Sequence, residues 1–201
     1  MKPIIFNTEM VQAILDGRKT QTRRVIKFPK GAYPHWYHGQ NEDETHDFAF
    51  GEISNGCCLD WTDTIKAPFK PGDVLYIKET WRYEDFMYID DWSAHIRYRA
   101  DNVLGNRIIC RDGADSRTGW QSSAHMSLEA ARLFLRVTDV GAERIQDITN
   151  EDMLKEGYPR GWGQYNFGDL WDSINTKRGY GWDTNPWVWV YTFERIEKED
   201  A

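Results

Sequence analysis

The chain has few of the features that mark secreted, membrane-spanning or nucleotide-binding proteins. It contains 3 cysteines among 201 residues and no Cys-x-x-Cys pair, which argues against a disulfide framework and fits a reducing cytoplasm. It shows neither an apolar run of about 18 residues, as a membrane helix needs, nor a secretory signal. Gly-x-x-x-x-Gly-Lys and Gly-x-Gly-x-x-Gly loops are also missing, so nucleoside-triphosphate and dinucleotide folds are not supported. We expect a cytoplasmic protein with no cofactor and no membrane partner.

Paired metal ligands are also scarce. His35, His38 and His46 precede the adjacent Cys57 and Cys58. This arrangement lacks the two ligand pairs, at regular spacing, that zinc sites in small domains use. We therefore predict no metal site.

Charge is distributed unevenly along an acidic chain. The net charge of −7 counts against non-specific duplex binding, which depends on many Lys and Arg contacts to phosphates. Residues 17–40 nevertheless carry six basic side chains and no acid, whereas residues 31–65 carry seven acids and no Lys or Arg. The pattern predicts a positive site for an anionic or electron-rich ligand, beside a solvated acidic insertion.

Hydrophobic periodicity predicts an α+β fold of short elements. We expect strands near 3–6, 20–28, 74–77, 94–100, 133–140 and 187–193, and helices near 8–16, 150–156 and 167–174. Asn7 or Thr8 should cap the first helix and Thr149 the second. Glycine and proline punctuate 29–70, and we interpret 29–70 and 101–125 as loop insertions in a single domain over residues 1–201. With no βαβ rhythm, this order favours a small, partly closed mixed β-barrel with short helices packed at its ends.

One predicted strand alternates cleanly between apolar and basic residues. Ile96 and Tyr98 fall on one face, and His95, Arg97 and Arg99 fall on the other. The pattern is typical of a strand with one buried face and one solvated face.

The most distinctive block of the sequence is Gly17-Arg18-Lys19-Thr20-Gln21-Thr22-Arg23-Arg24, preceded by Phe6-Asn7, Met10 and Ile14-Leu15-Asp16. Together with three other blocks, it resembles the ASCH family of PUA-like barrel domains, which phages and prophages often encode. The others lie in residues 71–81 (Pro71-Gly72-Asp73-Val74-Leu75-Tyr76-Ile77-Lys78-Glu79-Thr80-Trp81), 137–149 and 170–190. The resemblance implies a PUA-like β-barrel with a cleft beside the G-x-K-T-x-T-x-R element.

The resemblance also implies a partner and a chemistry. ASCH domains are expected to bind RNA or modified nucleosides, and one bacterial branch hydrolyses the acetyl amide of N4-acetylcytidine with a lysine, a threonine and a glutamate. The matching positions are Lys19 as base, Thr22 as nucleophile and Glu156 to orient the lysine or carry a proton. Residues 19 and 22 point to opposite faces of a regular strand, so this role requires a turn or bulge after Gly17. The alternative is an ordinary ion pair between Lys19 and Glu156, with Thr22 as a strand residue.

The same basic segment supplies candidate phosphate contacts. Arg18, Thr20, Arg23 and Arg24 are predicted to bind substrate, because guanidinium forks suit bidentate oxyanion binding. The alternative for the arginines is a solvated strand edge, where charge discourages aggregation.

Three further residues are candidate base contacts. Glu79 is predicted to read an exocyclic amine or, alternatively, to pair with an arginine. Trp81 and Trp182 lie at element ends and are predicted to stack bases, whereas Trp171 and Trp187 have core periodicity.

The sequence thus predicts a cytoplasmic, phage-type ASCH protein that binds RNA or a modified nucleoside and hydrolyses N4-acetylcytidine-like substrates. A non-catalytic RNA-binding module, an ASCH-type ribonuclease and a phage assembly protein are the alternatives. Fold resemblance cannot choose among them, because function depends on the site.

Overall fold

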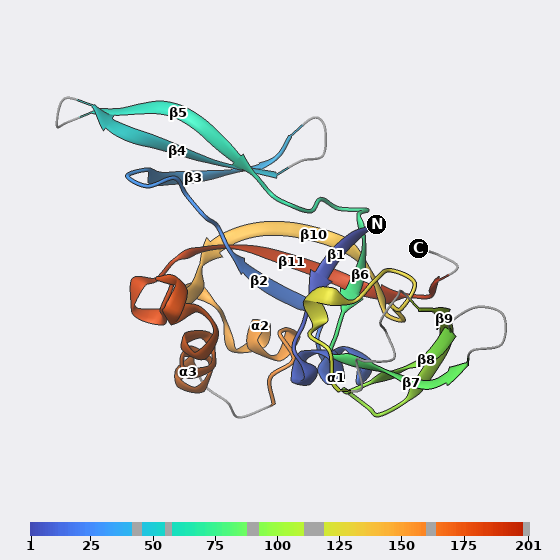
Figure 1. Ribbon diagram of the computed structural model, residues 1–201. Helices are drawn as coiled ribbons and strands as arrows, with labels where there is room; N and C mark the ends of the chain where they lie inside the picture. The colour runs from blue at the N-terminus through green and yellow to red at the C-terminus, as the bar shows by residue number, and fades with distance from the viewer. Residues whose placement is uncertain (42–45, 55–57, 88–92, 111–118, 160–163, 199–201) are drawn as a thin grey trace. The chain divides into compact units, whose positions relative to one another are not determined.

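The computed structural model describes residues 1–41, 46–54, 58–87, 93–110, 119–159 and 164–198. These residues form a mixed α+β structure of short helices and strands, which confirms the predicted class (Figure 1). None of the helices in the described ranges is long and apolar enough to cross a membrane. The chain forms two compact units: unit 1 comprises Met1–Gly17, Val74–Arg136 and Arg195–Ala201, and unit 2 comprises Arg18–Asp73 and Val137–Glu194. The single-domain organisation stays a prediction.

Unit 1 begins with the predicted strand and helix, β1 (Lys2–Ile5) and α1 (Thr8–Leu15). Asn7 caps the helix: its side-chain oxygen accepts the backbone N–H of Met10 at 2.8 Å, which satisfies a donor that the first helical turn leaves unpaired. Gly17 follows the C-cap with φ +72°, a conformation that glycine adopts without strain.

Unit 1 contains part of a mixed sheet and the whole of a second, antiparallel sheet. Parallel pairing joins β1 to β6 (Val74–Lys78), and antiparallel pairing joins β6 to the first residues of β10 (Phe134–Arg144). A second, antiparallel sheet has the order β7 (Trp81–Met87), β8 (Ser93–Tyr98) and β9 (Leu104–Ile109). The predicted loop at 101–125 therefore contains a strand, because pairing with β8 supplies hydrogen bonds that the local sequence does not reveal. A 3₁₀ turn at Ser123–His125 follows.

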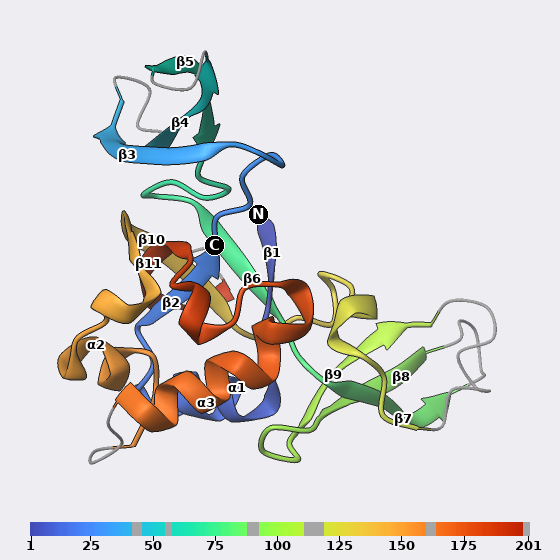
Figure 2. The same cartoon turned by 90° about the vertical axis from the view of Figure 1, so that its left-hand side faces the viewer.

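Unit 2 contains the rest of the mixed sheet, in the order β10, β11 (Trp187–Ile196) and β2 (Gln21–Val25). The predicted helices appear as α2 (Asn150–Lys155) and α3 (Gln164–Asn175). Short 3₁₀ turns lie at Ile145–Asp147, Thr176–Arg178 and Trp182–Thr184. One apolar core joins these parts: Ile145, Ile148, Met153, Phe167, Trp171 and Val188. Both helices lie on one side of the β10–β11–β2 sheet (Figures 1 and 2).

The predicted irregular insertion at 29–70 instead contains a three-stranded antiparallel sheet. Its strands are β3 (Tyr33–Gln40), β4 (His46–Ser54) and β5 (Cys58–Lys66). Gly39 and Gly51 are typical of loops in the sequence, but both lie at register shifts inside strands, where glycine accommodates the irregular backbone. The sheet also contributes apolar side chains to the packing. The ring centroid of Phe48 lies 4.7 Å from that of Trp187 and 5.3 Å from that of Phe28.

The predicted barrel is not closed. In the strand order β1-β6-β10-β11-β2, β1 and β2 are the two ends, and a barrel would require a hydrogen-bonded ladder between its end strands. The chain between them folds into α1 rather than a hairpin, so the described strands form open sheets.

Candidate functional site

The basic segment 18–20 is held beside the end of α2 by main-chain hydrogen bonds. Lys19 and Glu156 form an isolated antiparallel bridge. The Thr20 N–H donates to the carbonyl oxygen of Lys155 at 2.7 Å. Residues that lie far apart in the sequence are thereby adjacent, and this bridge brings the Lys19 and Glu156 side chains together.

The Lys19 amine is buried among three acceptors. Its side chain is 0% exposed, and Nζ donates to Glu156 Oε2 at 2.5 Å, to the Glu156 carbonyl at 2.9 Å and to the Gln21 carbonyl at 2.8 Å. Burial lowers the pKa of Lys19 because it penalises the charged form, and the charge and hydrogen bond of Glu156 oppose this effect. The site thus holds a lysine whose proton is easier to remove than usual.

Arg23 joins this pair from β2. Its side chain is 1% exposed; Nε donates to Glu143 Oε1 at 2.6 Å, and Nη1 lies 3.4 Å from Glu156 Oε1. Asp152 Oδ2 lies 3.7 Å from Nη2. Burial raises the pKa of Glu143, although Arg23 lowers it in part. Two buried cations therefore share the Glu156 carboxylate, and we call Lys19, Arg23, Glu143, Asp152 and Glu156 the Lys19 cluster.

The strand register separates Thr22 from Arg23. Thr22 lies opposite Tyr191 and Arg23 lies opposite Val190 in the antiparallel β2–β11 pair. Because neighbouring strand residues point to opposite faces, Thr22 shares a face with Tyr191, whereas Arg23 uses the other face to reach Glu156. The described contacts join Lys19 to Glu156 without Thr22, and the catalytic roles of all three residues stay predictions.

The other candidate residues of the basic segment differ in exposure. Arg18 is exposed, and its Nη1 donates to the Gly157 carbonyl at 2.6 Å. Thr20 is half-buried and bonds through its main chain. Arg24 lies on the same face of the sheet as Thr22, opposite Trp189. The basic residues of this segment therefore do not form one solvated edge, since Lys19 and Arg23 are buried.

Glu79 and Trp81 belong to unit 1 and have partners there. Glu79 is 1% exposed and accepts two hydrogen bonds from Arg132, at 2.9 and 3.0 Å, which is the arginine pairing offered as its alternative role. Trp81 is 3% exposed in the apolar core, where the alternation of β7 points it inward. Its ring is therefore buried in this structure, and its role in base stacking stays a prediction.

Trp182, in unit 2, is half-buried rather than free. Its ring packs edge-on at 5.8 Å from that of Phe167, and Gly168 approaches it so closely that an added Cβ would lie 3.3 Å from the indole. Trp182 thus contributes to the packing of α3.

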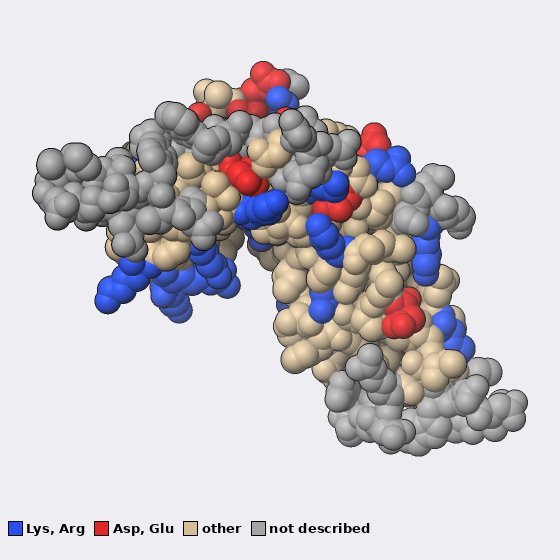
Figure 3. All heavy atoms as spheres, turned by 90° about the horizontal axis from the view of Figure 1, so that it is seen from above, with Lys and Arg blue, Asp and Glu red and all other residues tan. Residues whose placement is uncertain are grey.

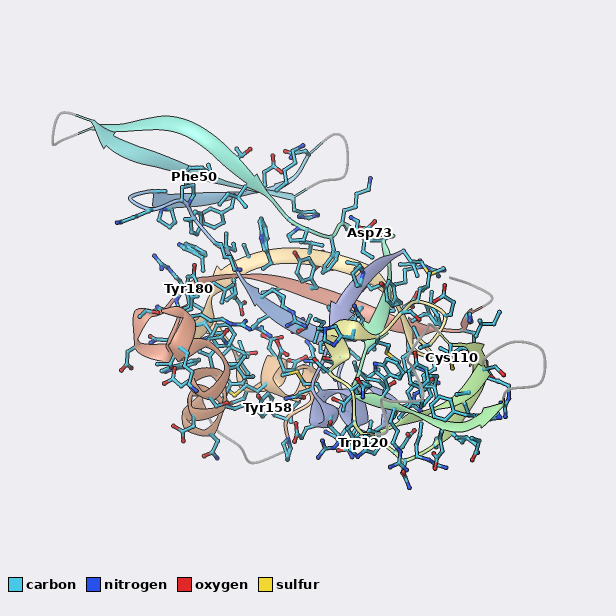
Figure 4. The ribbon with its side chains drawn as sticks, in the orientation of Figure 1. Phe50, Asp73, Cys110, Trp120, Tyr158 and Tyr180 are labelled. Carbon is cyan, nitrogen blue, oxygen red and sulfur yellow. The ribbon has the colours of Figure 1, made fainter. Side chains whose placement is uncertain are left out.

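Three neighbours of the pair were not predicted as site residues: Glu143, Asp152 and Tyr158. Asp152 and Glu156 are four residues apart at α2, a spacing that puts two acids on one helical face and could have signalled the cluster. Burial, and then the charge of Glu156, raises the pKa of Tyr158, which lies beside α2 (Figure 4). Glu143 gave no local signal, because only the packing of β10 beside β11 brings it to Arg23.

No metal ligand set is found in the parts of the chain that the structure describes. Cys57 lies outside those parts, as do the side chains of His35, His38 and Cys58. The fifth candidate, His46, is buried, and burial lowers its pKa.

The Lys19 cluster adds almost nothing to the basic surface of the protein. Lys19 and Arg23 have side chains 0% and 1% exposed, so the Lys and Arg atoms visible on the face in Figure 3 belong to other residues.

Comparisons with protein-family models, with curated proteins and with solved structures give no match. The site is therefore interpreted from its own geometry.

Proposed function

We propose that the protein is a PUA-like domain of ASCH type that binds RNA or a modified nucleoside beside residues 18–24 and hydrolyses the acetyl amide of N4-acetylcytidine-like substrates. The observation that carries this proposal is the Lys19 amine: it is buried, its pKa is lowered, and it is held by Glu156. These are the two residues for which the sequence motif implies proton transfer.

The buried amine supports acid–base chemistry. A neutral Lys19 removes a proton from the nucleophile, which is either a water molecule or the Thr22 hydroxyl. The oxygen of the nucleophile then adds to the carbonyl carbon of the acetyl group. The C–N4 bond then breaks, and the proton passes from Lys19 through Glu156, 2.5 Å away, to the leaving amine. The products are cytidine and acetate when water attacks. When Thr22 attacks, an acetyl ester forms first and water releases acetate from it.

The test is to incubate the full chain with N4-acetylcytidine and to measure cytidine by chromatography. Lys19→Arg keeps the charge but cannot act as a base, and we expect at least about a 100-fold loss of turnover. Thr22→Ala separates the two nucleophiles, because only attack by Thr22 requires its hydroxyl. Lys155→Arg changes a more exposed lysine on α2 and is the matched control. Absent turnover by the wild type, or equal turnover by Lys19→Arg, would contradict the hydrolase.

A second candidate is a non-catalytic binding module in the same fold. The observation that favours it is that Lys19 Nζ has three acceptors, one for each N–H of an ammonium, so the cluster also suits a structural cation. RNA binding that weakens steeply with salt, without release of cytidine, is the expected result for this module.

A further inference from the structure

The outward face of the β7–β8–β9 sheet in unit 1 is rich in arginine. The cross-strand pairs Arg82–Arg97 and His95–Arg107 lie on one face, since directly paired residues share a face. The opposite face carries the buried residues Trp81, Tyr83, Ala94, Ile96 and Tyr98. The sheet thus confirms the predicted alternation of residues 94–100 and presents its basic side outward.

An exposed tryptophan stands beside these arginines. Main-chain bonds between Trp81 and Gln121 place residues 120–121 along β7. Trp120 is 39% exposed, with the Arg82 guanidinium 5.0 Å and the Arg99 guanidinium 5.8 Å from its ring centroid (labelled in Figure 4). Trp120 is therefore an exposed aromatic ring with two guanidiniums nearby, unlike the buried Trp81.

Among the described residues of this face, arginines outnumber acids. Glu84 accepts from Arg97 and, at 3.4 Å, from Arg82, which accounts for one negative charge. Arg107 donates to the carbonyl of Asp85 at 3.0 Å, which leaves its charge uncompensated by that contact. Arg82, Arg97, Arg99 and Arg107 thus stand near the Glu84 carboxylate, on a protein whose net charge is −7.

We propose that this face binds single-stranded nucleic acid, with a base stacked on Trp120 and backbone phosphates beside Arg82 and Arg99. Base–aromatic stacking with flanking guanidiniums is how proteins bind unpaired strands, and a duplex cannot offer a base face to Trp120. The inference goes beyond the proposed function, because none of these residues belongs to the Lys19 cluster.

The test measures fluorescence anisotropy of a short fluorescein-labelled single-stranded RNA of mixed sequence with the full chain. We expect Trp120→Ala to weaken binding about tenfold and Trp120→Phe to retain most of it, because stacking needs only a ring. Arg99→Gln should also reduce the slope of log affinity against log salt by about 0.7, the value for one phosphate contact on a single strand. Arg195→Gln removes another exposed arginine of unit 1 and should leave affinity nearly unchanged.

Three results would overturn the proposal. They are wild-type affinity in both Trp120→Ala and Arg99→Gln, equally tight binding of the matching duplex, and displacement of the RNA by polyglutamate as effectively as by unlabelled RNA. Thermal melting of each variant confirms that it is folded. Trp120→Ala should turn over free N4-acetylcytidine like the wild type, because Trp120 does not belong to the Lys19 cluster. Loss of turnover in Lys19→Arg tests the hydrolase alone, so failure of one proposal is distinguishable from failure of the other.

Discussion

The two units each bury a cluster of charges, and the clusters differ in what they stabilise. In unit 1, Arg132 donates to both oxygens of Glu79 and to both oxygens of Asp101, and its guanidinium lies 3.9 Å from the ring centroid of Tyr98. Although burial lowers the pKa of Arg132, its hydrogen bonds to Glu79 and Asp101 raise it. This Arg132 cluster holds a permanent charge in a bidentate fork.

In the Lys19 cluster of unit 2, two buried cations share one carboxylate. Lys19 and Arg23 converge on Glu156, and burial dominates the lowered pKa of the lysine. An arginine fork with two carboxylates favours the ionised state, whereas a buried lysine with a second cation nearby is easier to deprotonate. The comparison shows that the burial of charged side chains does not by itself indicate a site for proton transfer. The residue type and the direction of its pKa shift separate a structural cluster from a candidate for proton transfer.

The largest expected effect is in the Lys19 cluster. Glu156→Ala leaves Lys19 and Arg23 buried without their shared carboxylate, and we expect the free energy of unfolding to fall by about 3–5 kcal/mol. Urea unfolding at pH 7 measures it. Glu151→Ala, on the same helix but with a side chain 78% exposed, is the control and should change stability by less than about 0.5 kcal/mol. A loss below about 1 kcal/mol in Glu156→Ala would show that the cluster is not a buried ion network in solution.

Removing the cation of the Arg132 cluster should cost somewhat less. Arg132 is 18% exposed, so water can partly solvate what remains, and we expect Arg132→Ala to lower the free energy of unfolding by about 2–3 kcal/mol. Urea unfolding at pH 7 measures this loss as well.

The same variant should show a pH dependence that comes from Glu79. Burial raises the pKa of Glu79, and the contacts with Arg132 that oppose this shift are absent in Arg132→Ala. A carboxyl with a raised folded pKa contributes stability below its unfolded pKa of 4.5 and loses it as the pH rises through the folded value. The deficit should therefore shrink as the pH falls from 7 towards 4.5, and a pH-independent deficit would contradict this.

The Arg132 cluster also depends on the position of Tyr98. A Cβ added to Gly105 would lie 2.4 Å from Tyr98 Cε2, and the Tyr98 hydroxyl is held by a 2.7 Å bond to the Ala130 carbonyl. We expect Gly105→Ala to lower the free energy of unfolding by about 1–2 kcal/mol through overpacking. Gly119→Ala is the control, because its Cβ would meet nothing within 4 Å. Equal melting temperatures for the two variants would show that Tyr98 moves without cost.

The smallest expected effect is a pH dependence that comes from the buried Lys19 amine. The pKa of Lys19 is near 10.5 when unfolded and lower when folded, so between these values the unfolded state binds more protons. The free energy of unfolding should therefore increase as the pH rises through this window. Lys19→Met should lose this increase below pH 10.5, whereas Lys155→Met should keep it, because contacts with Glu151 and Asp152 raise the pKa of Lys155. Identical urea-midpoint profiles for Lys19→Met and the wild type would contradict a lowered pKa.

Elements with a strong local signal were predicted well. Asn7 caps α1 and Thr149 caps α2, as expected from side-chain oxygens placed before helical patterns. The strand predicted near 187–193 is present as β11, and the alternation in β8 also lies as predicted. The strands β3–β5 were missed because glycines at bulges resemble glycines in loops, and β9 because only its pairing with β8 reveals it.

The sequence by itself determined which segments form helices and strands near their caps and alternating runs, and it identified the basic segment that contains Lys19. Only the tertiary structure decided that Lys19 meets Glu156, that Thr22 faces Tyr191, and that Trp120 rather than Trp81 is exposed. The physical reason is range. Caps and alternation depend on neighbours within a few residues, whereas burial, strand register and charge pairing depend on contacts between residues far apart in the chain.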